Sequence, residues 1–96
     1  MIRHVNLGDN DSERSRRLFR LIKSGDVTFG GYAKERIYGM LKCRSGKRMK
    51  LENRVFFKDE KEALDAGYRP CAHCLPEKYK FWKAKQNGII FENNSK

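Results

Sequence analysis

Apolar residues recur along the first quarter of the chain with the spacing of an amphipathic helix. Between residues 11 and 24, Leu18, Leu21 and Ile22 fall at positions i, i+3 and i+4 and therefore share one helical face. Apart from Phe19, polar and charged residues occupy the remaining positions of this stretch. The pattern predicts a helix over residues 11–24.

The middle of the chain has short apolar runs typical of strands. We expect a strand in residues 27–32, VTFGGY, meeting a glycine turn at Gly30 and Gly31. The runs RIYGML, residues 36–41, and RVFF, residues 54–57, predict two more strands.

Two helical patterns follow these strands. Residues 58–67, KDEKEALDAG, carry apolar side chains on one side, and residues 76–87, PEKYKFWKAKQN, begin with a proline suited to a first helical turn. The last residues, IIFENNSK, have no clear period, so we expect one domain over residues 1–88 and a frayed tail over 89–96. The element order predicts a small α+β domain with a short, mostly antiparallel three-stranded sheet flanked by helices.

Capping residues bound the first two helices. Asp11 or Ser12 is a suitable N-cap for the first, and Asp59 for the second. Gly25 and Gly67 are placed to end the two helices in left-handed turns.

The charge of the chain favours a polyanionic partner. Charged residues make up 35% of the 96 residues, and the net charge is +10. Nucleic acid fits this charge better than an anionic membrane, and the alternative is a basic protein without such a partner. No apolar run approaches the ~20 residues of a membrane span, and the N-terminus lacks an apolar signal region. We therefore expect a cytoplasmic location, where reducing conditions keep cysteines as thiols or metal ligands.

The three cysteines indicate a metal site. Cys71 and Cys74 have the C-x-x-C spacing with which two thiolates bind one tetrahedral ion from a single turn, and Cys43 is a distant third thiolate. Zinc is the expected ion. A redox pair and unligated structural thiols are the alternatives, but no strand of the thioredoxin type precedes Cys71.

The sequence leaves the fourth zinc ligand open. His4 lies before the first helix and can fold back, so we include it in the expected ligand set. His73 lies between the paired cysteines, and its ring is expected to point away from the metal. Water or an aspartate is a further way to close the site.

A longer set of residues resembles a known family. The stretches ENRVFF, residues 52–57, and KEALDAGYRPCAHC, residues 61–74, are similar to blocks of the N-terminal zinc-binding domain of the Ada adaptive-response protein. RIYGMLKCRSGKRM, residues 36–49, is similar to the strand and basic loop of that family. The resemblance spans roughly residues 12 to 80 and is most specific at the Arg-Pro-Cys-x-x-Cys end.

The resemblance implies a zinc site and raises a question about activity. In the family, two loop cysteines separated by three residues and a C-x-x-C pair bind one zinc. The first loop cysteine also accepts a methyl group from a methyl phosphotriester in DNA. Cys43 matches the second loop cysteine, but Gly39 stands at the acceptor position and has no nucleophile. The resemblance therefore implies the fold and the zinc ligands Cys43, Cys71 and Cys74, without the acceptor.

A basic segment surrounds Cys43. No acidic residue interrupts the sequence KCRSGKRMK, in which we expect the nucleic-acid contacts at Lys42, Arg44, Lys47, Arg48 and Lys50. Its small residues let backbone N–H groups approach a phosphate, and the resemblance places DNA-backbone contacts around the same loop. A solvated basic loop without a partner is the alternative.

These observations support three functions. The first is a zinc-binding module that binds nucleic acid, with DNA ahead of RNA, and lacks the methyl-acceptor cysteine. The second is a residual enzyme resembling the methyl phosphotriester repair methyltransferase, with Cys43 as acceptor or a zinc-bound water as nucleophile. The third is a zinc-stabilised protein-interaction module. Oligomeric state and sequence specificity have no signal in the sequence.

Overall fold

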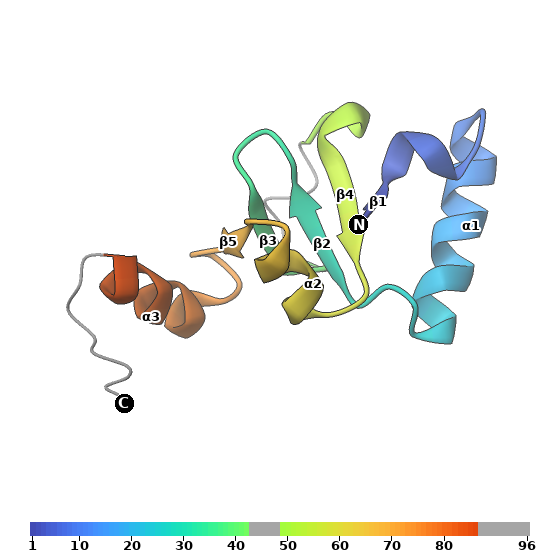
Figure 1. Cartoon of the computed structure of the whole chain (residues 1–96). Helices are drawn as coiled ribbons and strands as arrows, with labels where there is room; N and C mark the ends of the chain where they lie inside the picture. Colours follow the sequence, from blue (N-terminus) through green and yellow to red (C-terminus); the bar gives the residue numbers. More distant parts are fainter. Residues whose placement is uncertain (43–48, 87–96) are drawn as a thin grey trace.

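A five-stranded sheet forms the centre of the computed structural model, which describes residues 1–42 and 49–86 (Figure 1). Its strands are β1 (Ile2–Arg3), β2 (Phe29–Tyr32), β3 (Ile37–Met40), β4 (Arg54–Phe57) and β5 (Arg69–Pro70). The spatial order is β1-β4-β2-β3-β5, with every pair antiparallel except the parallel pair of β3 and β5. The predicted α+β class with a mostly antiparallel sheet is confirmed.

The sheet has two strands more than the sequence predicted. Both missed strands, β1 and β5, lie at the edges and contain two residues each. A run of two residues has no hydrophobic period, so only pairing with a sequence-distant strand defines it.

Three helices and two 3-10 turns complete the described chain. The helices are α1 (Asp11–Ser24), α2 (Glu60–Asp65) and α3 (Pro76–Gln86). The 3-10 turns are η1 (His4–Leu7) and η3 (Leu51–Asn53). In Figure 1, α1 stands beside the β1 edge, while α3 lies beyond the opposite edge, next to β5. Within the described residues, no helix is long and apolar enough to span a membrane.

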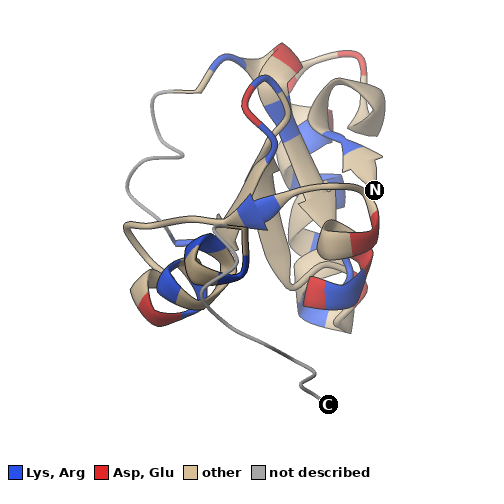
Figure 2. Ribbon diagram, turned by 60° about the vertical axis from the view of Figure 1, so that its left-hand side comes forward, with Lys and Arg blue, Asp and Glu red and all other residues tan. Residues whose placement is uncertain are grey.

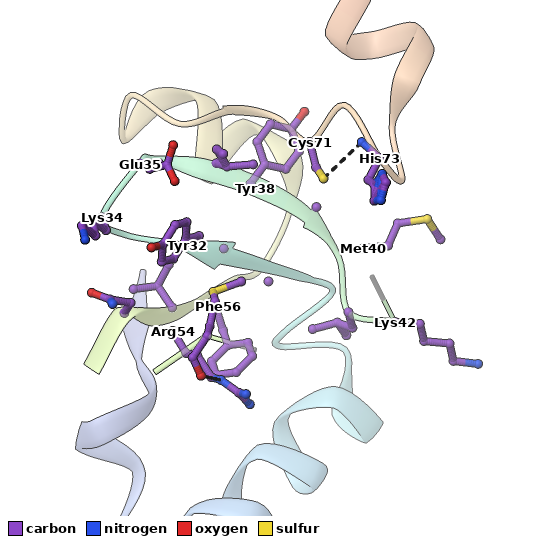
Figure 3. Close-up of a pocket in the computed structure, with 18 of the residues that line it drawn as sticks. Tyr32, Lys34, Glu35, Tyr38, Met40, Lys42, Arg54, Phe56, Cys71 and His73 are labelled. Carbon is purple, nitrogen blue, oxygen red and sulfur yellow. Dashed lines mark hydrogen bonds between the residues drawn. The ribbon is translucent and has the colours of Figure 1, made fainter. Parts of the chain in front are cut away.

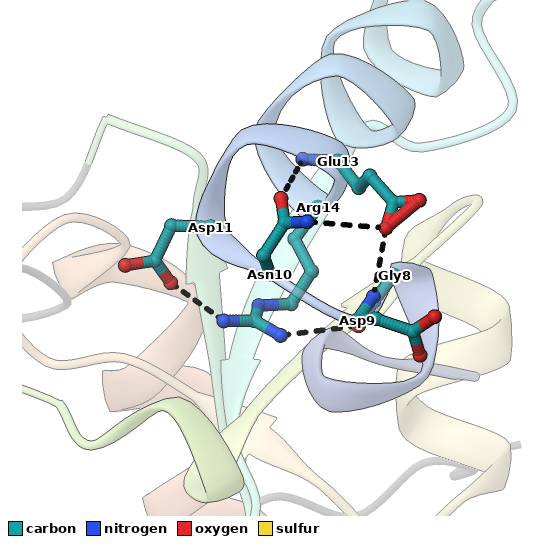
Figure 4. A network of polar contacts seen from close by, with 6 residues as sticks. All are labelled: Gly8, Asp9, Asn10, Asp11, Glu13 and Arg14. Atoms are coloured by element: carbon teal, nitrogen blue, oxygen red, sulfur yellow. Dashed lines mark hydrogen bonds and ion pairs between the residues drawn. The ribbon is translucent and has the colours of Figure 1, made fainter.

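The N-cap of α1 differs from the prediction by one residue, although the helix begins at Asp11 as predicted. Asn10 is the N-cap, and its side chain accepts a hydrogen bond of 2.9 Å from the backbone N–H of Glu13 (Figure 4). Glu13 in return accepts from the backbone N–H of Asp9 at 3.3 Å. Asn10 caps the helix better than Asp11 or Ser12 because its extended backbone and short amide satisfy a first-turn donor.

The other predicted caps are confirmed. Asp59 caps α2 by accepting from the backbone N–H of Glu62 at 2.8 Å. Gly25 follows α1 directly and Gly67 follows Ala66, the C-cap of α2, and the two glycines adopt positive φ angles of 85° and 86°. Side chains strain such a backbone, so glycine ends both helices cleanly.

The adjacent glycines at positions 30 and 31 do not form a turn, in contrast to the prediction. Gly30 and Gly31 lie inside β2, where they pair with Gly39 and Tyr38 of β3. A β-carbon on Gly31 would lie 2.8 Å from a ring carbon of Phe57. Close packing within the sheet therefore requires glycine here. In the sequence alone, such a pair of glycines looks the same as a turn signal.

Two apolar clusters cover opposite faces of the sheet. One contains Tyr38, Val55 and Phe57 from the strands, packed against α2 and Tyr68. The other contains Phe56, together with Leu7 and Val27, and is covered in part by α1. The alternation of Val55, Phe56 and Phe57 along β4 supplies both clusters, because successive strand residues face opposite ways.

Side-chain contacts fasten α3 to the rest of the domain. The guanidinium of Arg69 lies over the rings of Tyr79 and Trp82, at 5.0 Å and 5.8 Å from their centroids. Glu60 accepts hydrogen bonds from Tyr38 at 3.0 Å and from Lys78 of α3. α3 is therefore held by a cation–π cluster and one charged bridge, and none of its residues is buried.

Candidate metal centre

The Cys71–Cys74 turn is fixed to the sheet by the strand that precedes it. β5 pairs in parallel with β3, and the backbone N–H of Cys71 extends this pairing by donating to the carbonyl of Tyr38 at 2.8 Å. The N–H of Leu75 then donates to the Cys71 carbonyl at 3.0 Å, which closes the turn before α3 begins at Pro76. The sequence predicted a turn between two helices, and the structure adds the strand that positions it.

Backbone N–H groups donate to both sulfur atoms of the turn. The N–H of Met40, at the end of β3, donates to Sγ of Cys74 at 3.2 Å. The N–H of His73 donates to Sγ of Cys71 at 3.4 Å (Figure 3). These two contacts fix the orientation of both sulfurs within the turn, and a metal would bind them as thiolates.

Gly39 lies directly against the sulfur pair. A β-carbon at this position would lie 2.7 Å from Sγ of Cys74 and 3.9 Å from Sγ of Cys71. Real β-carbons do not approach a sulfur as closely as the first distance, so any side chain at position 39 would displace the turn. The structure thus places Gly39, which only the resemblance had linked to the cysteine pair, against Cys71 and Cys74.

The structure does not bring His4 to these cysteines. His4 follows β1 at one edge of the sheet, whereas Cys71 follows β5 at the other. Four strand spacings separate the two edges, about 19 Å in all, which exceeds the reach of a ligand bond. The ring of His4 instead packs edge-on against the ring of Phe56, with 5.3 Å between the two centroids, and the His4 side chain is buried there. His4 is therefore too far away to bind a metal held by this turn.

The environment of His4 also disfavours a charged ring. Its burial lowers its pKa below the usual value, and the nearby cations of Arg54 and Arg14 add to this effect. A cavity of about 300 Å³ borders these three residues. No local pattern indicated this burial, because His4 precedes the first predicted element.

Some of the other residues predicted to bind metal or nucleic acid are described by the structure, and some are not. His73, Lys42 and Lys50 are described, and all three side chains are exposed. The others, Cys43, Arg44, Lys47 and Arg48, lie outside the described residues. Among residues 1–42 and 49–86, no three His, Cys, Asp or Glu side chains gather as a metal site.

The donor set nevertheless suits zinc. Two half-buried thiols come from one tight turn with the zinc-binding spacing, and both sulfurs accept N–H hydrogen bonds. Gly39 keeps the β3 side of the pair clear of side-chain atoms. Cys71 and Cys74 would hold the ion from this side, where it would tie the start of α3 to the sheet.

A groove of about 1070 Å³ opens beside the cysteine turn (Figure 3). Its floor is the face of β2, β3 and β4 that carries Gly30, Gly39 and Phe56, and Cys71 and His73 form part of its wall. Its described lining includes five cationic side chains, namely those of Lys34, Lys42, Lys50, Arg54 and Arg69. Only two acidic side chains, those of Glu35 and Glu52, belong to the same described lining.

Three cations of this groove were not assigned from the sequence: Lys34, in the turn between β2 and β3, and the strand residues Arg54 and Arg69. Arg54 and Arg69 each stand next to buried apolar residues, so the local sequence around them indicates a strand and not a binding site. The alternation of side chains along a strand was the available signal for Arg54. Arg54 precedes the buried Val55 in β4, so its side chain lies on the opposite face of the sheet. Figure 2 shows Lys and Arg on several further elements, including α3.

Comparison with known proteins gives one match. Residues 18–77 match the family described as the metal binding domain of Ada. This stretch covers more than half of the chain and runs from α1 through the cysteine turn to the first residues of α3. No curated protein and no solved structure matches the chain.

Proposed function

Because the chain belongs to the family of Ada metal binding domains, we propose that it is a zinc-stabilised module that binds nucleic acid, with DNA as the first candidate. The proposed module is a single domain over residues 1–88 in a reducing, cytoplasmic compartment. The observation that carries the proposal is the cysteine turn seated on β3 at the wall of a cationic groove. Family membership supports the metal, and the groove supports the polyanion.

The proposed metal ligands are Cys43, Cys71 and Cys74. When bound, zinc supplies a tetrahedral crosslink and keeps its thiolates deprotonated near neutral pH. The Cys71–Cys74 turn is suited to this role because Met40 and His73 already donate N–H groups to its sulfurs. Such a crosslink would join the segment after β3 to the start of α3, a helix that has no buried residue.

The proposed nucleic-acid contacts are phosphate contacts. Lys42 and Lys50 are exposed on the groove, and they flank the segment that contains Arg44, Lys47 and Arg48. Flexible cationic side chains around small residues recognise phosphate oxygens without reading bases. The net charge of +10 also supports association of the protein with a polyanion.

Methyl transfer is the less favoured function because of Gly39. If position 39 corresponds to the acceptor of the family, this chain has no thiol to receive the methyl group there. The packing at Gly39 also leaves no room for a side chain unless the cysteine turn moves. A repair activity would therefore have to use Cys43, and mass spectrometry after incubation with methylated DNA would detect one added methyl group on that residue.

A salt titration tests the nucleic-acid proposal. We expect the zinc-loaded chain to bind a labelled DNA duplex in fluorescence anisotropy, with log K falling linearly with log salt because bound counterions are released. Lys42→Gln and Lys50→Gln should each reduce the steepness of this dependence by about one phosphate contact, roughly 0.9 in slope. Lys83→Gln on the exposed side of α3 is the matched control and should leave the slope near the parent value.

Two results would contradict the proposal. Absence of binding at low salt, with zinc bound, would exclude DNA as the partner. Equal effects of Lys42→Gln, Lys50→Gln and Lys83→Gln would show only a diffuse charge effect with no role for the groove. Single-stranded RNA in the same assay distinguishes DNA from RNA.

A further inference from the structure

The cavity of about 300 Å³ beside His4 lies at the opposite edge of the sheet from the cysteine turn. Its described lining comes from η1, the start of α1, the η3 region and the first residue of β4. The lining residues are His4, Asp11, Arg14, Ser15, Met49, Leu51 and Arg54. Neither Cys71 nor Cys74 belongs to this lining, so the cavity is separate from the candidate metal centre.

Arg14 brings a largely buried positive charge to the cavity. Its side chain is 14% exposed, whereas the side chain of Asp11, with which it pairs at 2.6 Å, is 96% exposed (Figure 4). Solvent therefore screens the carboxylate much more than the guanidinium. The guanidinium of Arg54 is a second cation, and Asp11 is the only acid of the described lining. The charge within the cavity is thus mainly positive.

Two buried nitrogen atoms of these side chains lack hydrogen-bond partners in the described chain. They are Nδ1 of His4, whose side chain is 9% exposed, and Nε of Arg14. Buried polar atoms are normally hydrogen-bonded, because burial without a partner costs stability. An oxyanion in the cavity would supply the acceptor oxygens that these two side chains lack.

We propose that the cavity between His4, Arg14 and Arg54 binds a small oxyanion of the phosphate or sulfate type. Guanidinium groups suit such a ligand because their N–H groups match the spacing of its oxygens. The hydroxyl of Ser15 is a further donor in the lining. The proposal goes beyond the function proposed above, since it needs neither the metal nor a nucleic acid.

Anion binding and protonation of His4 should favour each other. Burial lowers the pKa of His4 first, followed by the charges of Arg54 and Arg14, whereas Asp11 raises it. A bound anion opposes the two arginine charges and therefore raises the pKa of the ring. By linkage, a protonated ring binds the anion more tightly, because it becomes a donor at both nitrogens.

The imidazole NMR signals of His4 provide a direct test. The full chain is titrated from pH 8 to pH 5.5 in chloride and in sulfate at equal ionic strength, and His73→Gln identifies the signals of His4. Sulfate keeps both charges over this range. We expect a saturable effect of sulfate that raises the pKa of His4 by about one unit. Sulfate affinity should accordingly increase by up to about tenfold as the pH is lowered.

Three variants separate the cavity from the overall charge. Arg14→Gln removes a buried guanidinium and should abolish the effect of sulfate on His4. Ser15→Asp adds an acid to the lining and should weaken sulfate binding by about fivefold. Arg20→Gln makes the same change in net charge at an exposed position of α1 outside the described lining, so it should bind sulfate like the parent chain.

An unchanged pKa of His4 in sulfate would overturn the proposal. A response that does not saturate, or that falls equally in Ser15→Asp and Arg20→Gln, would also overturn it, because either result shows only screening of the net charge. If Arg14→Gln does not fold, the comparison of Ser15→Asp with Arg20→Gln still decides the question. None of these readouts depends on DNA binding, so failure here leaves the proposed function untouched.

A second titration distinguishes two sources of the oxyanion. Thymidine 5′-monophosphate replaces sulfate, with thymidine as the control that lacks a phosphate. A similar rise in the pKa of His4 would support a site that also takes the terminal phosphate of a larger molecule. A response to sulfate without one to thymidine 5′-monophosphate would support a site for free oxyanions.

Discussion

A β-carbon on Gly31 would lie 2.8 Å from the ring of Phe57 and 2.9 Å from a methyl group of Val55. Both neighbours are fully buried, so they have no free space into which to move. At Gly30, on the opposite face, the nearest atom would be 3.7 Å away, which is ordinary contact. Adjacent glycines of one strand therefore have different roles.

Gly31→Ala is expected to destabilise the domain by about 2 kcal/mol, because overpacking forces buried side chains out of their preferred positions. Chemical denaturation measures the change. Gly30→Ala is the matched control and should alter the free energy of unfolding by no more than about 0.5 kcal/mol. Equal losses from the two substitutions would show that strand propensity, and not packing at Gly31, sets the requirement for glycine.

His4 is expected to make stability depend on pH. Its pKa is lower in the folded state than the usual 6.5, first through burial and then through Arg54 and Arg14. The unfolded chain therefore binds more protons in this range, and stability is fully present above about pH 6.5 and is lost as the pH falls below it. The free energy of unfolding should decrease as the pH is lowered from about 7 to about 5.

His4→Leu should weaken this dependence, because the variant has no proton to bind at that position. His73→Gln, at an exposed position, should keep the dependence of the parent chain. Denaturant titrations at several pH values measure both variants. An unchanged slope in His4→Leu would assign the pH dependence to other groups.

At the scale of elements, Glu60 connects three parts of the fold. It belongs to α2, accepts from Tyr38 of β3 at 3.0 Å, and is paired with Lys78 of α3. The hydrogen bond from Lys78 is the main cause that lowers the pKa of Glu60. One carboxylate of α2 thus contacts both the sheet and α3, and α3 depends on this contact together with the Arg69 cluster.

Glu60→Gln is expected to cost about 1 kcal/mol of stability, because it removes the charge from hydrogen bonds that are partly exposed. Asp65→Asn on the same helix breaks the exposed pair with Lys61 and should cost less stability than Glu60→Gln, because solvent screens this pair. Denaturation curves compare the two variants. Hydrogen exchange should show faster exchange in α3 for Glu60→Gln alone, and an unaffected α3 would mean that Arg69 anchors it without help.

At the scale of the whole molecule, the described core is small and divided. Eight apolar residues are buried within the described chain, and they form two clusters on opposite faces of the sheet. Domains of this size commonly rely on a metal or another crosslink. The position of the cysteine turn, between the sheet edge and α3, is where a crosslink would contribute most.

Removal of zinc should therefore lower the thermal stability of the whole domain. At 100 times the dissociation constant a ligand adds about 2.7 kcal/mol, which corresponds to roughly 10–20 °C in Tm for a domain of this size. Calorimetry with and without a chelator measures the shift. Cys71→Ser should show the low Tm in both conditions, whereas a parent Tm unaffected by the chelator would contradict a structural metal.

The sequence by itself determined the local structure. α1 and β4 have the predicted bounds, because each is set by a hydrophobic period and by flanking residues that the chain carries locally. The helix ends at Gly25 and Gly67, the cap at Asp59 and the family resemblance depended on short motifs in the same way.

The tertiary structure decided what depends on pairing between distant segments. β5 exists only because β3 lies beside it, and that pairing sets Gly39 against Cys71 and Cys74. The same strand order separates His4 from the cysteines by the width of the sheet, which no local pattern encodes. The groove likewise combines Arg54 and Arg69 from separate strands. Spacing within the chain specifies which groups are suited to a metal, whereas strand order specifies which of them meet.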